Sequence, residues 1–251
     1  MLRNSKGQVT VFIIIAIVIV VIGVSIFIFA KGDKSDSYSK GTDSVSLFIQ
    51  DCLENVGEEG LYFLGIQGGY YSVPIPKEKF NLIEIPIYWN AEEINLPSKI
   101  DIENEFSKYV DANLNFCLEN FQGVKDEGLK ITEIGNFSSN VLLGEKIILE
   151  LTYPLSIEKG DSFYELKSFY SELDFDFEEK HSFVNSFLLE QEKNPDYFPL
   201  TYVTNLAHEN DFNFELFDLD EDKTILSFVF NELNSENQPF VYSFIVDHGE
   251  K

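Results

Sequence analysis

The organisation of this chain is decided by residues 9–30, which read VTVFIIIAIVIVVIGVSIFIFA and contain no charged residue. At about 1.5 Å per residue, a helix of this length spans about 33 Å, close to the thickness of a membrane's hydrocarbon core. A surface helix of a globular domain is apolar on one face only, whereas this segment is apolar all round. We therefore expect a single transmembrane helix over residues 8–31.

The charges that flank this segment predict its orientation. Arg3 and Lys6 lie in a leader, residues 1–7, that has no acidic residue, whereas acids offset the lysines that follow the segment. Because positively charged flanks stay in the cytoplasm, the leader is expected to be cytoplasmic. After a polar linker over residues 32–44, residues 45–251 are then expected to form an extracellular domain. A cleaved secretory signal is the alternative, although its apolar region usually has only about 7–15 residues.

The region beyond the apolar segment has the composition of a folded and strongly acidic domain. All 43 Asp and Glu residues lie beyond position 31, together with 15 of the 18 Lys and Arg residues, which leaves a net charge of −28 there. The 24 Phe and 12 Tyr residues of the chain supply apolar surface that offsets chain entropy. Nucleic acid is not expected as a partner, because phosphate binding needs a cationic surface. The acidity indicates a solvated surface, with a site for cations or a basic partner as the alternative.

A resemblance to a known family is carried by Ser5–Phe12, which reads SKGQVTVF. This stretch resembles the leader of archaeal type IV prepilins with a class III signal peptide. The resemblance implies that a membrane peptidase cuts between Gly7 and Gln8, and that the apolar helix then packs in a filament core or stays in the membrane. Two features depart from the family: Phe12 stands where Glu is usual, and the polar stretch after residue 30 interrupts what is commonly one long helix.

The first half of the acidic domain is expected to contain two amphipathic helices, over residues 45–64 and 103–121. Apolar residues recur in both at helical spacing. The two cysteines of the sequence, Cys52 and Cys117, lie on these apolar faces, in a domain expected where oxidation can occur. A Cys52–Cys117 disulfide is the leading interpretation, and two buried free thiols are the alternative. The Gly-Gln leader, followed by a Cys-containing helix, the Gln-Gly-Gly-Tyr turn at residues 67–70 and a second Cys-containing helix, is also similar to single-pass surface proteins of archaea, a resemblance that implies no activity.

The remaining sequence predicts strands and shorter helices. Three prolines within residues 70–88 favour short edge strands and extended loop there. Further strands are expected over residues 129–134, 141–143, 146–154, 163–178, 212–217, 225–230 and 240–246, with helices over residues 181–192 and 197–208. The predicted fold class is α+β, with an antiparallel sheet, two to four packed helices and an optional subdivision near residue 125.

The sequence predicts no catalytic, cofactor-binding or metal site. Residues 218–222 begin like a calcium loop, but Lys223 stands where glycine is needed and Val229 where a bidentate glutamate is needed, so a solvated hairpin turn is expected. The acidic residues between 174 and 179 alternate with phenylalanine, as on the wet face of a strand. The three histidines are isolated from one another in the sequence. Enzyme activity therefore has no support from the motifs.

Asn136 begins the triplet Asn-Phe-Ser, which fits the acceptor pattern for N-glycosylation, with a chance match as the alternative. We expect a membrane-anchored, pilin-like cell-surface protein with a structural, adhesive or protein-binding role. Its expected partners are the lipid membrane and other copies or surface proteins. The alternative is an extracytoplasmic enzyme or ligand-binding module whose site is formed by residues far apart in the sequence.

Overall fold

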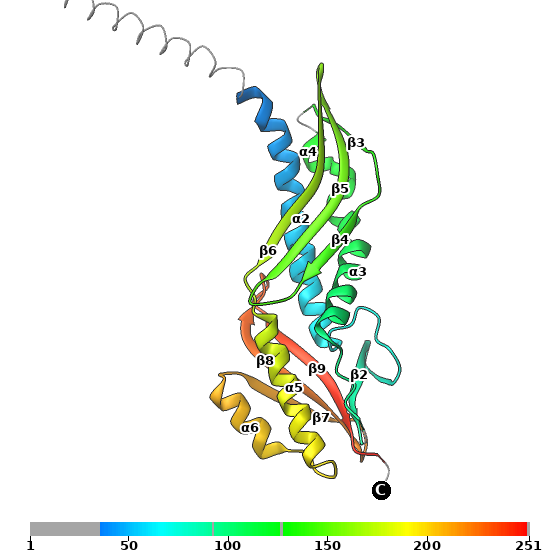
Figure 1. Cartoon of the computed structure of the whole chain (residues 1–251), viewed down its shortest axis with the longest axis vertical. Helices are drawn as coiled ribbons and strands as arrows, with labels where there is room; N and C mark the ends of the chain where they lie inside the picture. Colours follow the sequence, from blue (N-terminus) through cyan, green and yellow to red (C-terminus); the bar gives the residue numbers. More distant parts are fainter. Residues whose placement is uncertain (1–35, 92, 126–127, 250–251) are drawn as a thin grey trace, which may run out of the picture. The chain divides into compact units, whose positions relative to one another are not determined.

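The computed structural model describes residues 36–91, 93–125 and 128–249 (Figure 1), so the predicted transmembrane segment, residues 8–31, lies outside the described residues. None of the helices within the described ranges is long and apolar enough to cross a membrane. Residues 46–251 form one compact unit, which continues across position 125 without a division there. This unit combines helices with two sheets, so the predicted α+β class is confirmed.

Helix α2, Asp36–Ile66, is the element on which much of the unit packs. Its apolar stripe is buried as the periodicity predicts, at Val45, Ile49, Cys52, Leu53 and Val56. The helix begins earlier than the expected start at residue 45, so residues 36–44 of the expected polar linker are helical. Polar composition indicates solvation rather than irregular backbone, and a helix extends easily once nucleated because each added residue gains a hydrogen bond. Residues 32–35 lie outside the described residues.

Two glycines let α2 contact both sheets closely. A Cβ atom at Gly57 would overlap the side chain of Leu149 in the four-stranded sheet. A Cβ atom at Gly65 would lie 2.5 Å from the carbonyl oxygen of Val241 in the five-stranded sheet. Because neither position has room for a side chain, α2 is a support shared by the two sheets.

The four-stranded sheet is an antiparallel meander, as predicted from the second half of the sequence. Its long central strand is β5, and β6 pairs along one whole edge of it, while β3 and β4 share the other edge. Buried and exposed residues alternate along β5, with the buried side chains of Leu149, Leu151 and Leu155 on the inner face. The bounds are Lys130–Glu133 for β3, Ser138–Leu142 for β4, Ile147–Lys159 for β5 and Ser162–Leu173 for β6.

The strand predicted over residues 163–178 is too long. Strand β6 ends at Leu173, and helix α5, Phe177–Lys193, begins four residues later. The side chain of Asp176 caps this helix by accepting a hydrogen bond from the backbone N–H of Glu179 at 2.9 Å. An aspartate cap followed by acids in the first turn is typical of a helix start, and this signal was mistaken for the wet face of a strand.

Helix α3, Lys99–Leu118, lies beside α2 and is joined to it by a disulfide. Ser98 and Asp101 form a capping box that starts α3 four residues before the predicted position. The sulfur atoms of Cys52 and Cys117 are 2.12 Å apart, which agrees with the predicted pairing. Two short helical segments follow α3, the 3₁₀ helix η1 at Glu119–Phe121 and α4 at Gln122–Lys125.

The five-stranded sheet has the order β1-β2-β9-β8-β7 and is mixed rather than antiparallel, because β2 and β9 run in the same direction. The predicted edge position is correct for β1 but wrong for β2, which lies between β1 and β9. Pro86 is tolerated inside β2 because pairing with β9 starts only at Ile87. The bounds are Lys77–Phe80 for β1, Ile83–Asn90 for β2, Asn213–Asp218 for β7, Lys223–Leu233 for β8 and Pro239–Asp247 for β9.

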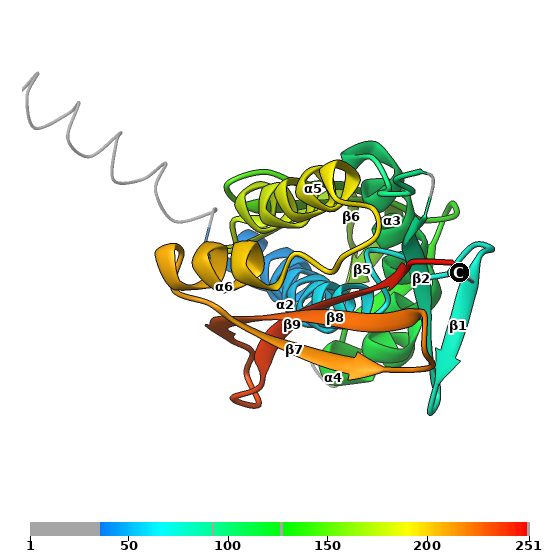
Figure 2. The same ribbon diagram turned by 90° about the horizontal axis from the view of Figure 1, so that it is seen from below.

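Helices cover one face of this sheet with aromatic side chains. Figure 2 shows α5 and α6, Leu200–Glu209, over β8 and β9. The ring of Phe187 in α5 lies 5.8 Å from that of Phe244, and the ring of Tyr62 in α2 lies 5.6 Å from that of Phe240. Phe240 and Phe244 are four positions apart on β9. Side chains an even number of positions apart on a strand point to the same face. The C-terminal part of α2 and the middle of α5 therefore contribute rings to one aromatic core.

Candidate functional site

Among the described residues that the sequence singled out, Cys52 and Cys117 are brought together in the disulfide, whereas Asn136 and the histidines lie apart from them. Gly7 and Gln8 lie outside the described residues. Asn136 is exposed in the segment between β3 and β4, where a glycan could be attached, and its modification stays a prediction. His181 and His248 each bond to a different proline carbonyl, Pro97 O at 3.2 Å and Pro195 O at 3.0 Å. Burial lowers the pKa of His181 from its ordinary value, against a raising effect of the Pro97 carbonyl.

The acidic turn that resembled a calcium loop connects β7 and β8, as the hairpin prediction required. One carboxylate oxygen of Asp220 accepts hydrogen bonds from the backbone N–H groups of Asp222 and Lys223, at 2.9 and 2.7 Å. Across the described ranges, no group of three or more His, Cys, Asp or Glu side chains is arranged to hold a metal ion. The turn is thus held by hydrogen bonds between the Asp220 side chain and the backbone of the same turn.

One edge of the four-stranded sheet is covered by α3. Asp111 accepts a hydrogen bond from the backbone N–H of Ser139 at 2.8 Å, and the Ser107 hydroxyl accepts one from the N–H of Val141 at 3.0 Å. Next along the same edge, Glu103 accepts one from the N–H of Leu143 at 2.9 Å. Side chains of the helix therefore satisfy three successive outward N–H groups at the edge formed by β4.

The spacing of this contact follows from the geometry of the two elements. The three helical residues are four positions apart and rise by about 6 Å from one to the next. The three amide groups are two positions apart on an extended chain, which advances by about 6.6 Å over the same step. Because the two repeats nearly match, one stripe of α3 can follow the strand edge without a gap.

The opposite edge of the same sheet, formed by β6, is open. Among the strands that the structure describes, β6 pairs with β5 alone. On its outer side, the Gln50 amide of α2 donates a hydrogen bond to the carbonyl oxygen of Tyr170 at 3.1 Å. Since N–H and C=O groups of one residue point to the same side of an antiparallel strand and alternate along it, Ser168 and Glu172 also direct their backbone groups outward.

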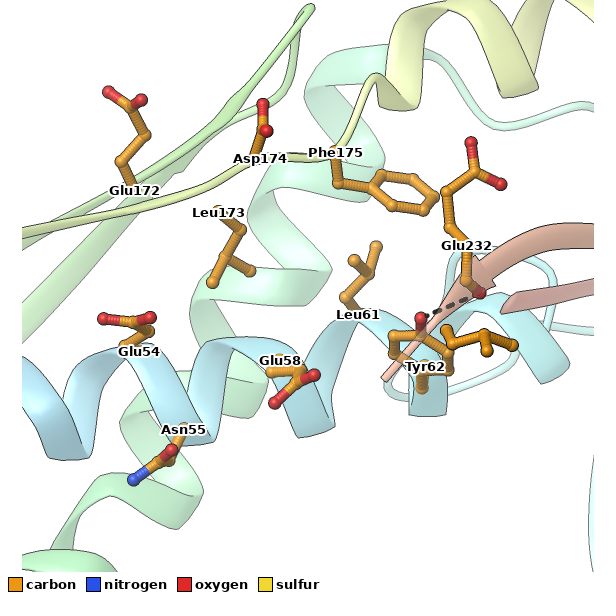
Figure 3. Close-up of a pocket in the computed structure, with 11 residues that line it drawn as sticks. Glu54, Asn55, Glu58, Leu61, Tyr62, Glu172, Leu173, Asp174, Phe175 and Glu232 are labelled. Carbon is orange, nitrogen blue, oxygen red and sulfur yellow. Dashed lines mark hydrogen bonds between the residues drawn. The ribbon is translucent and has the colours of Figure 1, made fainter. Parts of the chain in front are cut away.

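A pocket of about 320 Å³ lies where the open edge ends. It is formed by α2, by the end of β6 with the residues that follow it, and by β8 (Figure 3). Apolar side chains lie in its middle and carboxylates around them. The apolar side chains are Leu61, Leu173, Phe175 and Leu233, and the carboxylates belong to Glu54, Glu58, Glu172, Asp174 and Glu232.

Some of these carboxylates are already engaged. Glu172 accepts hydrogen bonds from Lys146 and from the Tyr170 hydroxyl, which hold its pKa below the ordinary value. Glu58 accepts a hydrogen bond from the backbone N–H of Ser235 at 2.8 Å. By contrast, the carboxylates of Glu54 and Asp174 form no ion pair within the described part of the chain. These two remain available to a cationic group from outside.

Tyr62 lines the pocket close to two of its acidic residues, Glu58 and Glu232. Its hydroxyl donates a hydrogen bond to the carbonyl oxygen of Glu232 at 3.2 Å, as Figure 3 shows. Burial of the phenol, together with the charges of Glu58 and Glu232, raises its pKa to about 12. The charges of Glu58 and Glu232 near the phenol make a further anion unfavourable there and a cation favourable.

A buried lysine holds the far wall of the pocket. Lys180 of α5 pairs with Glu232 at 2.7 Å and with Glu179 at 2.8 Å, and its ammonium lies 5.9 Å from the ring centre of Phe175. Burial alone would lower the pKa of Lys180, but the bonds to Glu179 and Glu232 outweigh it and the pKa is raised. The ammonium stays charged and fixes Glu232 and Phe175 in place.

Sequence reasoning missed both the covered edge and the pocket. Glu103, Ser107 and Asp111 recur every four residues, a polar stripe that reads as a solvated helix face. The pocket combines three segments that lie more than 50 residues apart in the sequence. Of these two features, only the polar stripe could have been recognised from neighbouring residues in the sequence. Polar residues at helical spacing beside an apolar stripe can face a strand edge as well as solvent.

Comparisons with known proteins add no family to this geometry. No protein-family model matches the chain, and no curated protein and no solved structure matches it significantly. The functional argument therefore depends on the sequence and on the geometry described above.

Proposed function

We propose that this chain is a membrane-anchored, pilin-like protein of the cell surface whose extracellular domain binds other proteins. The anchor is the apolar segment of residues 8–31, and the positive leader before it keeps the N-terminus in the cytoplasm. An extracellular position of the domain is supported by the Cys52–Cys117 disulfide, because such bonds persist in oxidising surroundings.

The observation that carries this proposal is the place of α2 in the chain and in the fold. This helix begins at Asp36, shortly after the apolar segment, and buries its apolar stripe against an antiparallel sheet. In the family that the leader resembles, the membrane helix commonly runs on into the head domain as an amphipathic helix. A helix over residues 36–44 in place of a polar linker reduces one of the two departures from that family.

A binding role fits the surface better than a reaction does. The unit presents an unpaired strand edge and, at its end, a pocket with an apolar middle and carboxylates around it. Strand edges and pockets of this kind are used to recognise extended polypeptide. Processing between Gly7 and Gln8, and a glycan on Asn136, belong to the same proposal.

The anchor and its orientation are tested by expressing the full chain with a C-terminal tag in an archaeal host. The tagged domain is expected in the membrane fraction after a carbonate wash, and protease added to intact cells should remove it. The matched control lacks residues 1–31 and should be found in the soluble fraction. A tagged domain that resists protease in intact cells but not in lysed cells would contradict the proposed orientation.

The leader is tested separately by mass spectrometry of the N-terminus. Processing predicts a chain that starts at Gln8, and a Gly7→Val variant should keep the leader. A wild-type chain that still starts at Met1 or Leu2 would overturn processing and leave a plain membrane anchor.

A further inference from the structure

We propose that the open edge of β6 binds an extended, basic segment of another protein by strand addition, with one Lys or Arg side chain of that segment in the pocket at its end. This inference rests on the proposed protein-binding function and names the partner's chemistry. It is carried by three independent features of the described residues: the unpaired edge, the pocket and the distribution of charge.

The edge has the length and the chemistry that strand addition needs. Strand β6 has 12 residues without proline, and its outward backbone groups face away from β5. The bond from Gln50 to the carbonyl oxygen of Tyr170 occupies one acceptor, and an incoming N–H group can take the place of the Gln50 amide. Main-chain hydrogen bonds along such an edge supply affinity that does not depend on the partner's sequence.

The pocket determines which side chain of the added strand can bind at the end of the edge. Its walls include Glu172 and Leu173, the last two residues of β6, so a strand added along the edge ends over it. The apolar middle around Leu61 and Phe175 suits the methylene stem of a lysine or arginine. The cationic head then meets the unengaged carboxylates of Glu54 and Asp174 at the rim.

The charge of the domain decides between a basic partner and a second copy of this chain. A net charge of −28 beyond residue 31 repels a second copy at long range. Pairing of two β6 edges would also bring two strongly acidic domains into contact, and contact between like charges is destabilising. A basic segment is instead attracted at long range and paired on contact.

The test measures binding of a fluorescein-labelled peptide of alternating Lys and Thr residues to the full chain in detergent micelles. Fluorescence anisotropy should show saturable binding. The same peptide with Glu in place of Lys should bind at least about tenfold more weakly, because it repels the pocket. A peptide N-methylated at alternate residues should lose at least about tenfold as well, because it cannot donate to the edge.

Two pairs of variants of the chain locate the site. Ser168→Pro removes an outward N–H group from β6, where proline is tolerated, and should abolish binding of the Lys peptide. Ser168→Ala keeps this N–H group and should bind like the wild type. Glu54→Gln combined with Asp174→Asn should weaken the Lys peptide by about tenfold, whereas Glu192→Gln on the exposed side of α5 should have no effect.

Three outcomes would overturn the inference. No binding of the Lys peptide, or equal binding by the Ser168→Pro variant, would exclude the β6 edge as its site. Concentration-dependent dimerisation in analytical ultracentrifugation that Ser168→Pro abolishes would make a second copy the occupant. Each of these results leaves the fractionation and protease experiments on intact cells unchanged, so a failure here is distinguishable from a failure of the proposed surface function. Circular dichroism of each variant should match the wild type and so verifies its fold.

Discussion

The two edges of the four-stranded sheet differ in how many of their backbone groups bond to a neighbouring helix. At the β4 edge, three side chains of α3 accept hydrogen bonds from successive backbone N–H groups. At the β6 edge, the Gln50 amide of α2 donates a hydrogen bond to the carbonyl group of Tyr170. Both edges belong to the same sheet and the same compact unit, so the difference is not a matter of general exposure. It shows that α3 follows the β4 edge with several side chains, whereas α2 contacts the β6 edge at Tyr170.

Covering the β4 edge prevents unwanted pairing with other chains. An exposed strand edge is a template for aggregation, and a helix laid over it is one of the ways in which proteins block it. Glu103 is buried in this position and its carboxylate bonds the N–H of Leu143. The edge of the 12-residue strand β6 has no such series of contacts from α3 and is accessible for pairing with another chain.

The largest change in stability is expected from removing the disulfide that holds α3, the helix over the β4 edge, against α2. The double variant Cys52→Ala with Cys117→Ala should lower the free energy of unfolding by about 4 kcal/mol, because the bond closes a long loop in the unfolded chain. Urea unfolding followed by the fluorescence of Trp89 measures it. Wild type treated with a reductant should show the same loss. A loss below about 1 kcal/mol would mean that packing alone holds α3 over the β4 edge.

The next largest effect is expected from removing one acceptor at the covered edge. Glu103→Leu leaves the N–H of Leu143 buried without a partner, which should destabilise the fold by about 1–3 kcal/mol. Glu103→Gln keeps an acceptor and should cost less. Hydrogen exchange at the Leu143 amide should be faster in the Leu variant than in the Gln variant. Equal exchange in both variants would show that the Glu103 contact does not protect this edge.

A smaller effect is expected from Ser107→Ala. The Ser107 hydroxyl accepts from the N–H of Val141 and donates to the carbonyl of Glu103, and its loss should destabilise by about 1 kcal/mol. The amide of Val141 should then exchange faster. Ser182→Ala is the matched control, because that hydroxyl bonds only within its own helix, α5. If both variants exchange alike at Val141, the ladder of contacts along β4 is not protective.

The smallest effect is expected at the open edge, from Lys146→Met. Lys146 and the Tyr170 hydroxyl hold the pKa of Glu172 on β6 below its ordinary value. A carboxylate with a lowered pKa in the folded state stabilises it above the ordinary pKa, and this stabilisation is lost as the pH falls through the lowered value. The substitution should therefore move the Glu172 pKa back upward, as measured by carbon NMR titration. Lys167→Met, which removes the partner of Glu165 instead, should leave Glu172 unchanged.

Local patterns in the sequence predicted most of the elements. The spacing of apolar residues around Cys52 and Cys117 located two helices and placed both sulfur atoms on inward faces, which suffices to predict their pairing. Alternation and glycines located the meander of β3 to β6. The local errors occurred where two patterns look alike: Asp176 caps a helix but follows a strand with the same acidic composition.

Long-range pairing could not be predicted in the same way. The parallel contact of β2 with β9 joins residues about 160 positions apart, and neither strand carries a signal for its partner. The acceptors at Glu103, Ser107 and Asp111 read as solvated until the position of β4 is known. Phe175 and Glu232 likewise become neighbours only when α5 and β8 are packed.

The sequence by itself determined the apolar segment at residues 9–30, the acidity of the region beyond it, the α+β class and the cysteine pair, because composition and periodicity are properties of neighbouring residues. The tertiary structure alone decided which sheet edge is covered and which is open, and where the pocket lies. These depend on which elements come together, and that choice is made by the packing of α2 and α3 against strands that lie far along the chain.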